Sequence, residues 1–312
     1  MTKSNAPLLS IGLPVFNGDK FLCKALDSLL SQEFADFELI VSDNASTDIT
    51  AEICKEYATR DARVRYIRQT ENMGGINNFN FVLREAHSKY FMWAAVDDQW
   101  APDFLHSLVA GLEKNSTAIG AFCPYQLVEE ETGIILEGIW KCDYEDRRAL
   151  IRLLKFTWQY RDTCIYGLFR REYLNDVQFK PWSWINAVTP YNLVYPLIYL
   201  LLSKGNFLLV GENALWFKSV TISHWHSTPF RGSPVVAYLV HIVRKMNLFL
   251  RSTGYIYLGS KSVLLAVAMV PFLLLRFFYD CITPIYAAVS IWLSGRKISQ
   301  VSPHEIWQLG VR

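Results

Sequence analysis

The segment at residues 90–98 reads YFMWAAVDD, and the predicted fold follows from it. Its first seven residues are almost all apolar, which is typical of a strand buried on both faces of a sheet. Two carboxylates, Asp97 and Asp98, follow at once. In open α/β sheets, ligands bind beyond the carboxyl ends of the strands. The segment therefore predicts a buried strand with a polar site at its end.

Three shorter apolar segments precede this strand, and segments with helical periodicity lie between them. The apolar segments span residues 8–16, 37–41 and 64–67, and the helical ones span about 21–30, 49–57 and the residues up to about 86. Repeated strand–helix units connect parallel strands through right-handed crossovers. The predicted fold class is therefore α/β, with a mostly parallel, doubly wound sheet.

Polar side chains follow three of these strands. Asn17 comes after the first, Asp43 and Asn44 after the second, and Asp97 and Asp98 after the fourth. Because the carboxyl ends of parallel strands meet at one edge, we expect these side chains to cluster. The alternative for Asp43 is a turn residue that caps the next helix, and the alternative for the carboxylate pair is a solvated turn.

The adjacent carboxylates Asp97 and Asp98 predict a site for a divalent cation. Side chains alternate along an extended chain, so the two carboxylates point in different directions. One can ligate Mg²⁺ or Mn²⁺, which commonly use one or two carboxylates together with substrate phosphates. The other can take a ribose or sugar hydroxyl. Such a cation neutralises the charge of a departing nucleoside diphosphate.

Four motifs occur in order along the first part of the chain. They are PVFNG at residues 14–18, VSDNASTD at 41–48, NMGG at 72–75 followed by Asn78, and VDD at 96–98. As a set they resemble the family 2 glycosyltransferases, over about the first 120 residues. The resemblance implies the GT-A fold, with a nucleotide-diphospho sugar as the donor substrate.

The resemblance also implies roles for individual residues. The position of Asp43 binds the base edge, and the loop of Gly74 and Gly75 closes over the nucleotide. These roles suit the residue types, because a carboxylate accepts a hydrogen bond from a base N–H and glycine allows close backbone approach. For Asn78, an exposed position on a helix is the alternative. The predicted nucleotide-binding residues are Pro14, Phe16, Asn17, Asp43, Asn44, Gly74, Gly75, Asn78, Asp97 and Arg231.

The chain departs from the family pattern in two places. The metal motif, often D-x-D or D-D-D, is only DXD-like because Val96 occupies its first position, and Asp98 is the predicted metal ligand. Inverting members also use an Asp or Glu in the second half as general base. Residues 177–211 contain no acidic residue, and the amides of Asn186 and Asn192 cannot act as a base.

Four acidic residues border this stretch. Asp162 is the candidate base because it precedes a predicted strand and can face the acceptor. We interpret Glu172, Asp176 and Glu212 as caps or surface charges. Asp97 is the other predicted catalytic residue.

A further polar segment at residues 223–232 reads SHWHSTPFRG, where the family often places a His or Arg loop over the diphosphate. His226 is a predicted metal ligand, with His224 as the alternative, and Arg231 is predicted to contact phosphate. A polar surface loop is the alternative interpretation.

The remaining pattern divides the chain into three parts. Beyond residue 120 we expect strands at 121–128, 134–139 and 165–169, and a late strand pair at 207–210 and 214–217. The expected organisation is a nucleotide-sugar-binding half of a GT-A domain (1–120), an acceptor-binding half (121–235) and a C-terminal helical segment (236–312).

Composition restricts the functional class. Apolar residues make up 51% of the 312 residues, enough for a sizeable core. The formal net charge of +2 gives no global basic excess, so nucleic acid is not an expected partner. The six cysteines have no metal-type spacing, which favours small core residues in a reducing compartment. No secretory signal is expected, because Gly12 and Pro14 interrupt the first apolar run.

The C-terminal part predicts contact with a membrane. The apolar run at residues 262–275 is shorter than the roughly 20 residues that span a bilayer, and Arg276 and Asp280 separate it from a second run at 281–293. One crossing would bury both charges. Two short helices in, or dipping into, the cytoplasmic leaflet fit better, because basic residues flank the runs. The alternative is a helical hairpin packed on the core or on a second subunit, which makes a homo-oligomer possible.

The leading hypothesis is an inverting glycosyltransferase that depends on Mn²⁺ or Mg²⁺ and acts at the cytoplasmic face of the inner or plasma membrane, as a peripheral or re-entrant protein. Its acceptor is expected to be a lipid-linked glycan in surface-polysaccharide assembly. A polyprenyl-phosphate sugar synthase is the first alternative, because an acceptor phosphate needs no general base. A catalytically silent nucleotide-binding scaffold subunit at the membrane is the second.

Overall fold

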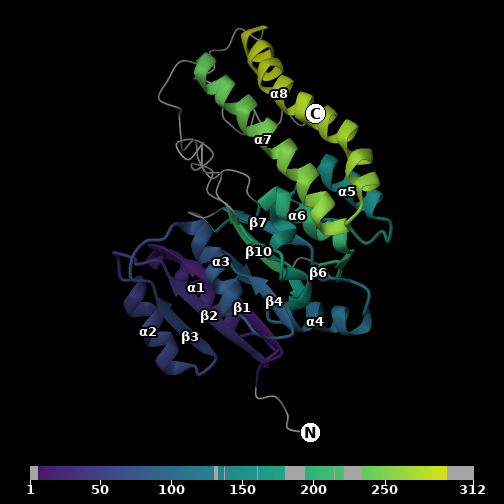
Figure 1. Ribbon diagram of the computed structural model, residues 1–312. Helices are drawn as coiled ribbons and strands as arrows, with labels where there is room; N and C mark the ends of the chain where they lie inside the picture. Colours follow the sequence, from purple (N-terminus) through teal and green to yellow (C-terminus); the bar gives the residue numbers. More distant parts are fainter. Residues whose placement is uncertain are drawn as a thin grey trace.

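The computed structural model describes residues 6–129, 133–136, 138–159, 161–179, 194–213, 215–220 and 234–293. These residues form two sheets surrounded by helices, with a pair of long helices at one end (Figure 1). The larger sheet has seven strands in the order β3-β2-β1-β4-β8-β6-β9, and the smaller has three in the order β5-β10-β7. The predicted α/β class with a mostly parallel sheet is confirmed.

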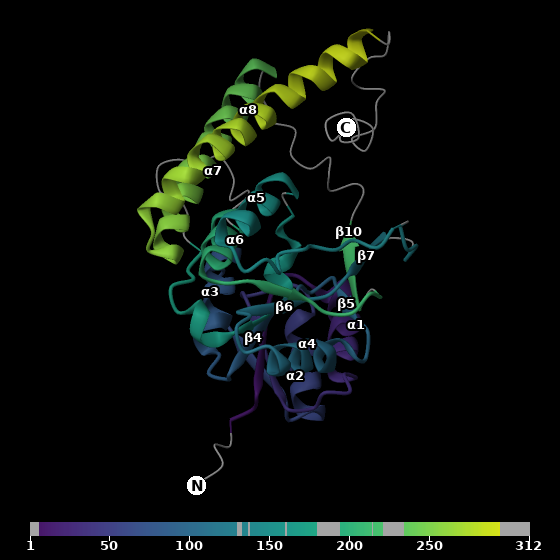
Figure 2. The same cartoon turned by 90° about the vertical axis from the view of Figure 1, so that its right-hand side faces the viewer.

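Strands β1 to β4 and the helices between them form the predicted strand–helix units. The strands are β1 (Leu9–Val15), β2 (Phe37–Asp43), β3 (Val64–Arg68) and β4 (Tyr90–Trp93). The helices are α1 (Asp19–Leu30), α2 (Thr50–Arg60) and α3 (Gly75–Glu85). Each helix turns one apolar side inward, and helices cover both faces of the sheet (Figure 2). Strand β1 pairs in parallel with both β2 and β4.

Strand β4 is buried as predicted but is shorter than the expected strand at 90–96. Its four residues are all buried, and the Ala94 N–H still donates to Gly12 O over 2.9 Å. The chain then leaves the sheet, so Asp97 and Asp98 lie in a loop before the two-residue strand β5 (Gln99–Trp100). The directions of the two carboxylates therefore follow from this loop and not from strand alternation.

The smaller sheet differs from the predicted strands. The expected strand at 121–128 is two strands, β6 (Gly120–Phe122) and β7 (Tyr125–Glu129), which join different sheets. Pro124, which has no N–H to donate, lies between them. The expected strand at 134–139 contributes a single bridge, Val128 to Ile135.

The predicted late strand pair is wrong, because its two members do not pair with each other. Strand β9 (Phe207–Leu209) pairs with β6 in the larger sheet. Strand β10 (Trp216–Val220) lies between β5 and β7 in the smaller sheet. This pairing brings β10 next to the loop that carries Asp97 and Asp98.

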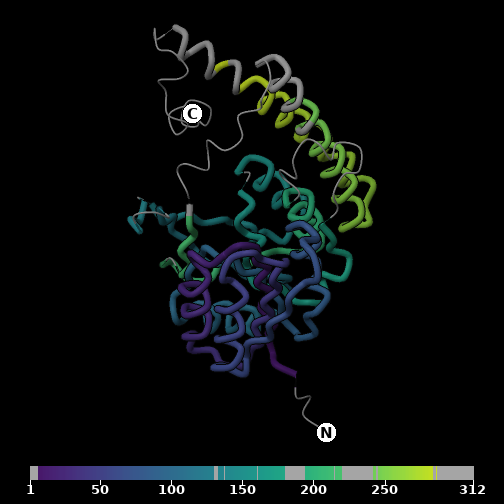
Figure 3. The backbone as a smooth tube through the Cα atoms, turned by 90° about the vertical axis from the view of Figure 1, so that its left-hand side faces the viewer, coloured from purple at the N-terminus to yellow at the C-terminus, as the bar shows by residue number. Residues whose placement is uncertain are grey.

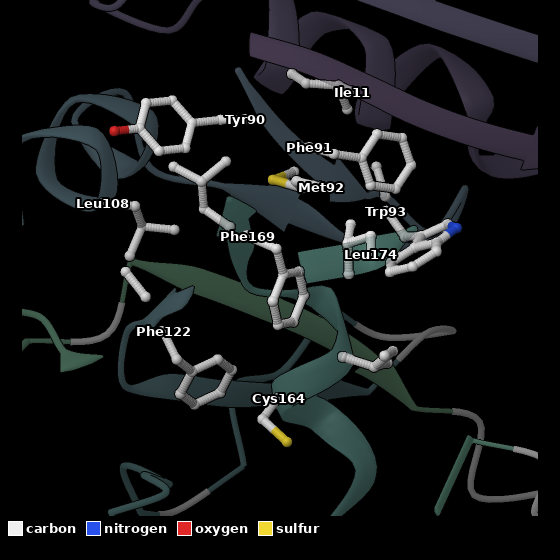
Figure 4. Packing of buried hydrophobic residues seen from close by; sticks show 14 of the residues in the cluster. Ile11, Tyr90, Phe91, Met92, Trp93, Leu108, Phe122, Cys164, Phe169 and Leu174 are labelled. Carbon is white, nitrogen blue, oxygen red and sulfur yellow. The ribbon is translucent and has the colours of Figure 1, made fainter. Parts of the chain in front are cut away.

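An aromatic core joins the first and second halves of the chain. Strand β8 (Leu168–Arg170) is antiparallel to β4 and β6, and the 3₁₀ helix η1 (Asp162–Tyr166) precedes it. Phe91 and Trp93 meet edge to face at 4.7 Å between ring centroids, and Trp93 and Phe169 at 6.3 Å (Figure 4). Both halves of the predicted GT-A domain therefore share one sheet and one core.

Four further elements were not predicted from the sequence. They are α4 (Phe104–Lys114), α5 (Ala149–Gln159), the 3₁₀ helix η2 (Arg171–Leu174) and α6 (Val194–Lys204). Helices α5 and α6 lie between the sheets and the C-terminal helices (Figure 1).

The C-terminal helices are longer than expected. In place of the two short helices expected at 262–275 and 281–293, the chain forms the single long helix α8 (Val263–Leu293). Helix α7 (Pro234–Ser260) precedes it, and the two run side by side (Figure 3). Helix α8 continues through Arg276 and Asp280 because these residues form an ion pair of 2.9 Å, one helical turn apart. Lys245 of α7 also donates to Asp280 over 2.8 Å. The two charges therefore join the helices and do not interrupt α8.

All six cysteines are free thiols. Cys23 is exposed and the other five are buried. Burial raises the pKa of both Cys54 and Cys123 to about 12. This agrees with the interpretation of most cysteines as small core residues.

Candidate active site

The loops after β1 and β2 are hydrogen-bonded to each other. Asn17 follows β1 in the left-handed region, with φ of 50°. Its N–H donates to Ser46 Oγ over 2.9 Å, and its Oδ1 accepts from the Thr47 N–H over 2.9 Å. These bonds hold two of the predicted site segments at the same edge of the sheet.

The loop before α3 is bonded to the same edge through Asn44. The Nδ2 of Asn44 donates to Asn72 Oδ1 over 2.8 Å, and its Oδ1 accepts from the Met73 N–H over 2.9 Å. Gly74, with φ of 83°, then turns the chain into α3, and both Gly74 and Gly75 are exposed. The structure therefore brings the predicted glycine loop together with Asn17 and Asn44.

Asp43 lies at the carboxyl end of β2 and is fully buried. Its Oδ1 accepts from the Ser46 N–H over 2.8 Å, so Asp43 forms a turn, which is the alternative to a contact with the nucleobase. Its Oδ2 accepts from the Tyr66 hydroxyl and from Arg68, each over 3.0 Å. The Arg68 side chain is 43% exposed and covers the carboxylate. A ligand that approaches Asp43 therefore also meets Arg68.

The other predicted nucleotide contacts differ in their exposure. Phe16 is 46% exposed at the end of β1, and Pro14 is partly buried. Asn78 is buried, which matches neither a surface position nor an open contact. Its Nδ2 donates to Ser42 O over 2.9 Å, and its Oδ1 accepts from Ser42 Oγ over 2.5 Å. Asn78 therefore connects α3 to β2 through two hydrogen bonds to Ser42.

Asp97 and Asp98 have different environments. Asp98 is 1% exposed: its Oδ2 accepts from Trp216 Nε1 over 2.8 Å, and its Oδ1 accepts from the Ser219 N–H over 2.9 Å. Burial raises the pKa of Asp98 to about 7, although Lys218 and the two hydrogen bonds act in the opposite direction. Asp97 is partly exposed, and its carboxylate has no hydrogen-bond partner among the described residues. Of the two, only Asp97 therefore has a carboxylate that is open to solvent and unpaired among the described residues.

Three further groups lie around this pair. Asp162 begins η1, Tyr166 ends it, and Lys218 extends from β10. The negative charges of Asp98, Asp162 and Asp97 all raise the pKa of the Lys218 ammonium. The structure therefore places the candidate base Asp162 in the same charged cluster as the predicted metal site.

The other acidic residues that border the acid-free stretch have different surroundings. Asp176 forms an ion pair of 3.2 Å with Lys204, and Glu172 and Glu212 are exposed. No interaction links these three residues to Lys218 in the described part of the chain. Of the four candidates, Asp162 therefore fits a role in the site best.

Lys218 was missed at the sequence level. The signal that would have found it is strand alternation, because Trp216 and Lys218 lie two residues apart in β10 and share a face. The predictions for His226 and Arg231 lie outside the described residues, as do Asn186 and Asn192.

Comparison with known proteins identifies the family. The sequence model of Glycosyl transferase family 2 matches residues 10–178, which is more than half of the chain. The chain therefore belongs to glycosyl transferase family 2. An uncharacterized glycosyltransferase of Haemophilus influenzae is 33% identical over 200 residues, covering 59% of this chain and 62% of the relative. The chain thus spans less than two thirds of that relative's length.

Two solved glycosyltransferase structures share the fold of this chain. Residues 1–349 of S. aureus TarS in complex with UDP-GlcNAc align with a TM-score of 0.53 and 16% identity, covering 97% of this chain and 88% of that 1–349 chain. The mannosyltransferase PcManGT of Pyrobaculum calidifontis, in complex with GDP-Man and Mn²⁺, aligns with a TM-score of 0.53 and 16% identity. It covers 99% of this chain and 85% of the other. The predicted GT-A fold is confirmed.

The buried bond between Trp216 and Asp98 predicts a measurable stability effect. Trp216→Phe leaves a buried carboxylate oxygen without its donor, so we expect the free energy of unfolding to fall by about 1–3 kcal/mol more than loss of ring volume alone explains. Urea denaturation measures this change. Trp100→Phe is the matched control, since the buried Trp100 indole has no hydrogen-bond partner among the described residues. Equal losses in both variants would contradict the assignment.

Proposed function

We propose that this chain transfers a sugar from a nucleotide-diphospho sugar, with inversion at the anomeric carbon, to a lipid-linked glycan in surface-polysaccharide assembly. The observation that carries the proposal is the cluster at the edge of the sheet, where the loops of Asn17, Asn44 and Gly74 are bonded together next to Asp97. In open α/β sheets, this edge is where ligands bind.

Relatives support both substrates of the proposal. TarS and PcManGT were solved with UDP-GlcNAc and with GDP-Man and Mn²⁺, respectively. A Campylobacter jejuni relative, 27% identical over 188 residues, is a GalNAc(5)-diNAcBac-PP-undecaprenol beta-1,3-glucosyltransferase. That match covers 59% of this chain and 58% of the relative. A bacterial polysaccharide acceptor on a lipid carrier is therefore the substrate class that we propose.

Asp97 fits a divalent cation better than Asp98 does. Mg²⁺ and Mn²⁺ often take one carboxylate and complete their coordination with substrate phosphates, and Asp97 has free oxygens for this. Asp98 would have to release Trp216 or Ser219 to become a ligand. In the described part of the chain, no three His, Cys, Asp or Glu residues are grouped as a metal site. The cation, when bound, neutralises the charge of the leaving diphosphate.

The two carboxylates can be separated by donor binding. We expect Asp97→Asn to lower the affinity for UDP, GDP or dTDP at least tenfold in the presence of Mn²⁺ and to remove the effect of Mn²⁺, because the amide is a poor cation ligand. Asp98→Asn should mainly reduce stability, since the amide N–H₂ would face another N–H donor. Calorimetric titration with and without Mn²⁺ measures the affinities. Loss of the Mn²⁺ effect in Asp98→Asn alone would identify Asp98 as the ligand.

We propose Asp162 as the general base that accepts the proton of the acceptor hydroxyl. It is partly exposed at the start of η1, and its carboxylate has no hydrogen-bond partner among the described residues. Its interaction with Lys218, next to Asp97 and Asp98, supports this role. A base positioned there deprotonates the hydroxyl as it attacks the anomeric carbon from the face opposite the leaving group.

Asp162→Asn tests this role. We expect transfer from the accepted donor of a UDP-, GDP- and dTDP-sugar panel to fall about 10²–10⁴-fold while nucleotide affinity is retained, because a base acts only in the chemical step. Asp176→Asn, at an exposed ion pair, is the control. Unchanged transfer in Asp162→Asn would favour an acceptor phosphate, as in a polyprenyl-phosphate sugar synthase. Nucleotide binding by the wild type without any turnover would overturn the enzyme proposal in favour of a scaffold subunit.

The apolar outer face of α8 supports a membrane surface as a partner. The segment Val263–Thr283 is long and apolar enough to cross a membrane by length and composition, and 22% of its most apolar part is buried. Asp280 is 8% exposed because it pairs with Arg276 and Lys245, so the charges point inward. The exposed residues recur three or four apart along one side of the helix: Leu264, Val267, Pro271, Leu275, Phe278, Ile282 and Tyr286. We propose that this side lies on the cytoplasmic membrane face where a lipid-linked acceptor is held.

Vesicle flotation tests the membrane proposal. We expect the wild type to float with vesicles that contain phosphatidylglycerol, and Leu264→Glu/Val267→Glu/Phe278→Glu to lose most of this binding while nucleotide affinity is retained. A control with Glu at exposed Ile49 and Ile139, far from α8 in sequence, should still float. A triple variant that floats like the wild type would contradict the proposal. A wild-type dimer that the triple variant converts to monomer would assign the face to a second copy.

A further inference from the structure

Lys218 presents a positive charge beside the carboxylate cluster. It shares a face of β10 with Trp216, whose indole is bonded to Asp98. Its Nζ lies 5.3 Å from the centroid of the Tyr166 ring and 5.6 Å from that of Trp216. Two aromatic rings therefore flank the ammonium, which restricts where it can point.

The ammonium has donors without acceptors in the described part of the chain. Lys218 is partly buried, yet no carboxylate or carbonyl of the described residues accepts a hydrogen bond from it. The nearby Asp98 already accepts from Trp216 and Ser219. Burial lowers the pKa of Lys218, but the surrounding negative charges, that of Asp98 foremost, raise it above its ordinary value overall. The side chain is therefore a permanent cation whose three N–H donors are available to a ligand.

We propose that Lys218 binds the diphosphate of the donor, as a second cationic contact in addition to any metal ion at Asp97. This inference rests on the proposed function, because it concerns the same donor site. An anionic ligand satisfies the donors of a partly buried ammonium, whose charge is costly to leave unpaired. A Lys ammonium binds phosphate as a point charge, so it needs no fixed fork geometry.

The charge balance of the site supports this role. Asp97, Asp98 and Asp162 bring three carboxylates close to a single ammonium. A diphosphate adds further negative charge, and Lys218 is a cation whose pKa all three of these carboxylates raise. Without it, the donor would meet repulsion wherever the metal does not screen it. A purely structural role, in which Lys218 only offsets the buried charge of Asp98, would not distinguish a diphosphate from an uncharged nucleoside.

The experiment compares ligands with and without phosphate. We expect Lys218→Met to weaken binding of UDP, GDP or dTDP about 10–100-fold in EDTA, while the affinity for the corresponding nucleoside stays within about twofold. Lys218→Arg, which keeps the charge, should recover most of the loss. Lys89→Met is the control, since Lys89 pairs with Glu113 at the opposite end of β4 and changes the net charge equally. Titration calorimetry measures the diphosphates, and ligand-observed NMR measures the nucleosides.

The outcomes separate this inference from the proposed function. Equal weakening of nucleoside and diphosphate, or unchanged diphosphate affinity in Lys218→Met, would overturn the role of Lys218 and leave the donor site intact. A wild type that binds none of the three nucleoside diphosphates would overturn both. Lys218→Gln provides the same comparison if the methionine variant does not fold, and a falling diphosphate affinity with rising salt in the wild type supports the cationic contact.

Discussion

The site depends on one buried carboxylate. Asp98 accepts hydrogen bonds from Trp216 Nε1 and the Ser219 N–H, and these bonds join the loop after β4 to β10. A buried carboxylate is costly unless its oxygens are bonded, so the loop and the strand hold each other in place. The loop after β4 also carries Asp97, and β10 also carries Lys218, so these bonds hold both residues of the proposed donor site in place. We propose that the roles suggested by the family pattern are divided between two adjacent residues: Asp98 holds the structure together, and Asp97 contacts the substrate.

Hydrogen bonds also hold together the loops at the edge of the sheet where we propose that the donor binds. Asn17 and Asn44 bond the loops after β1 and β2 and the loop before α3 to one another. Such pre-organisation reduces the entropy that a nucleotide must lose on binding. The proposed acceptor side is held by helix packing. Helix α7 packs on α6 and helix α8 packs on α5, and α8 carries the exposed apolar face. In the proposed function, one domain would hold both the polar donor and the lipid-linked acceptor.

The sequence predicted the first half of the fold well, because β1 to β4 and α1 to α3 carry strong periodicity. It did not predict β5, which has only two residues, or the separation of β6 from β7 at Pro124. The burial of Asp98 could not be predicted from the sequence, because its partner Trp216 lies 118 residues away in the chain. The C-terminal helices were predicted wrongly for a similar reason. In the sequence, Arg276 and Asp280 interrupt an apolar segment, but in the structure Lys245 of another helix pairs with Asp280.

The most direct test of the proposed site is a crystal structure of the protein with UDP-, GDP- or dTDP-sugar and Mn²⁺. We predict a binding mode with the nucleobase next to Phe16 and Arg68 and the diphosphate between Asp97 and Lys218. In this binding mode, the bonds of Asp98 to Trp216 and Ser219 remain intact. A diphosphate held by a metal ion on Asp98, with Trp216 displaced, would contradict it, as would a nucleotide bound away from this edge of the sheet.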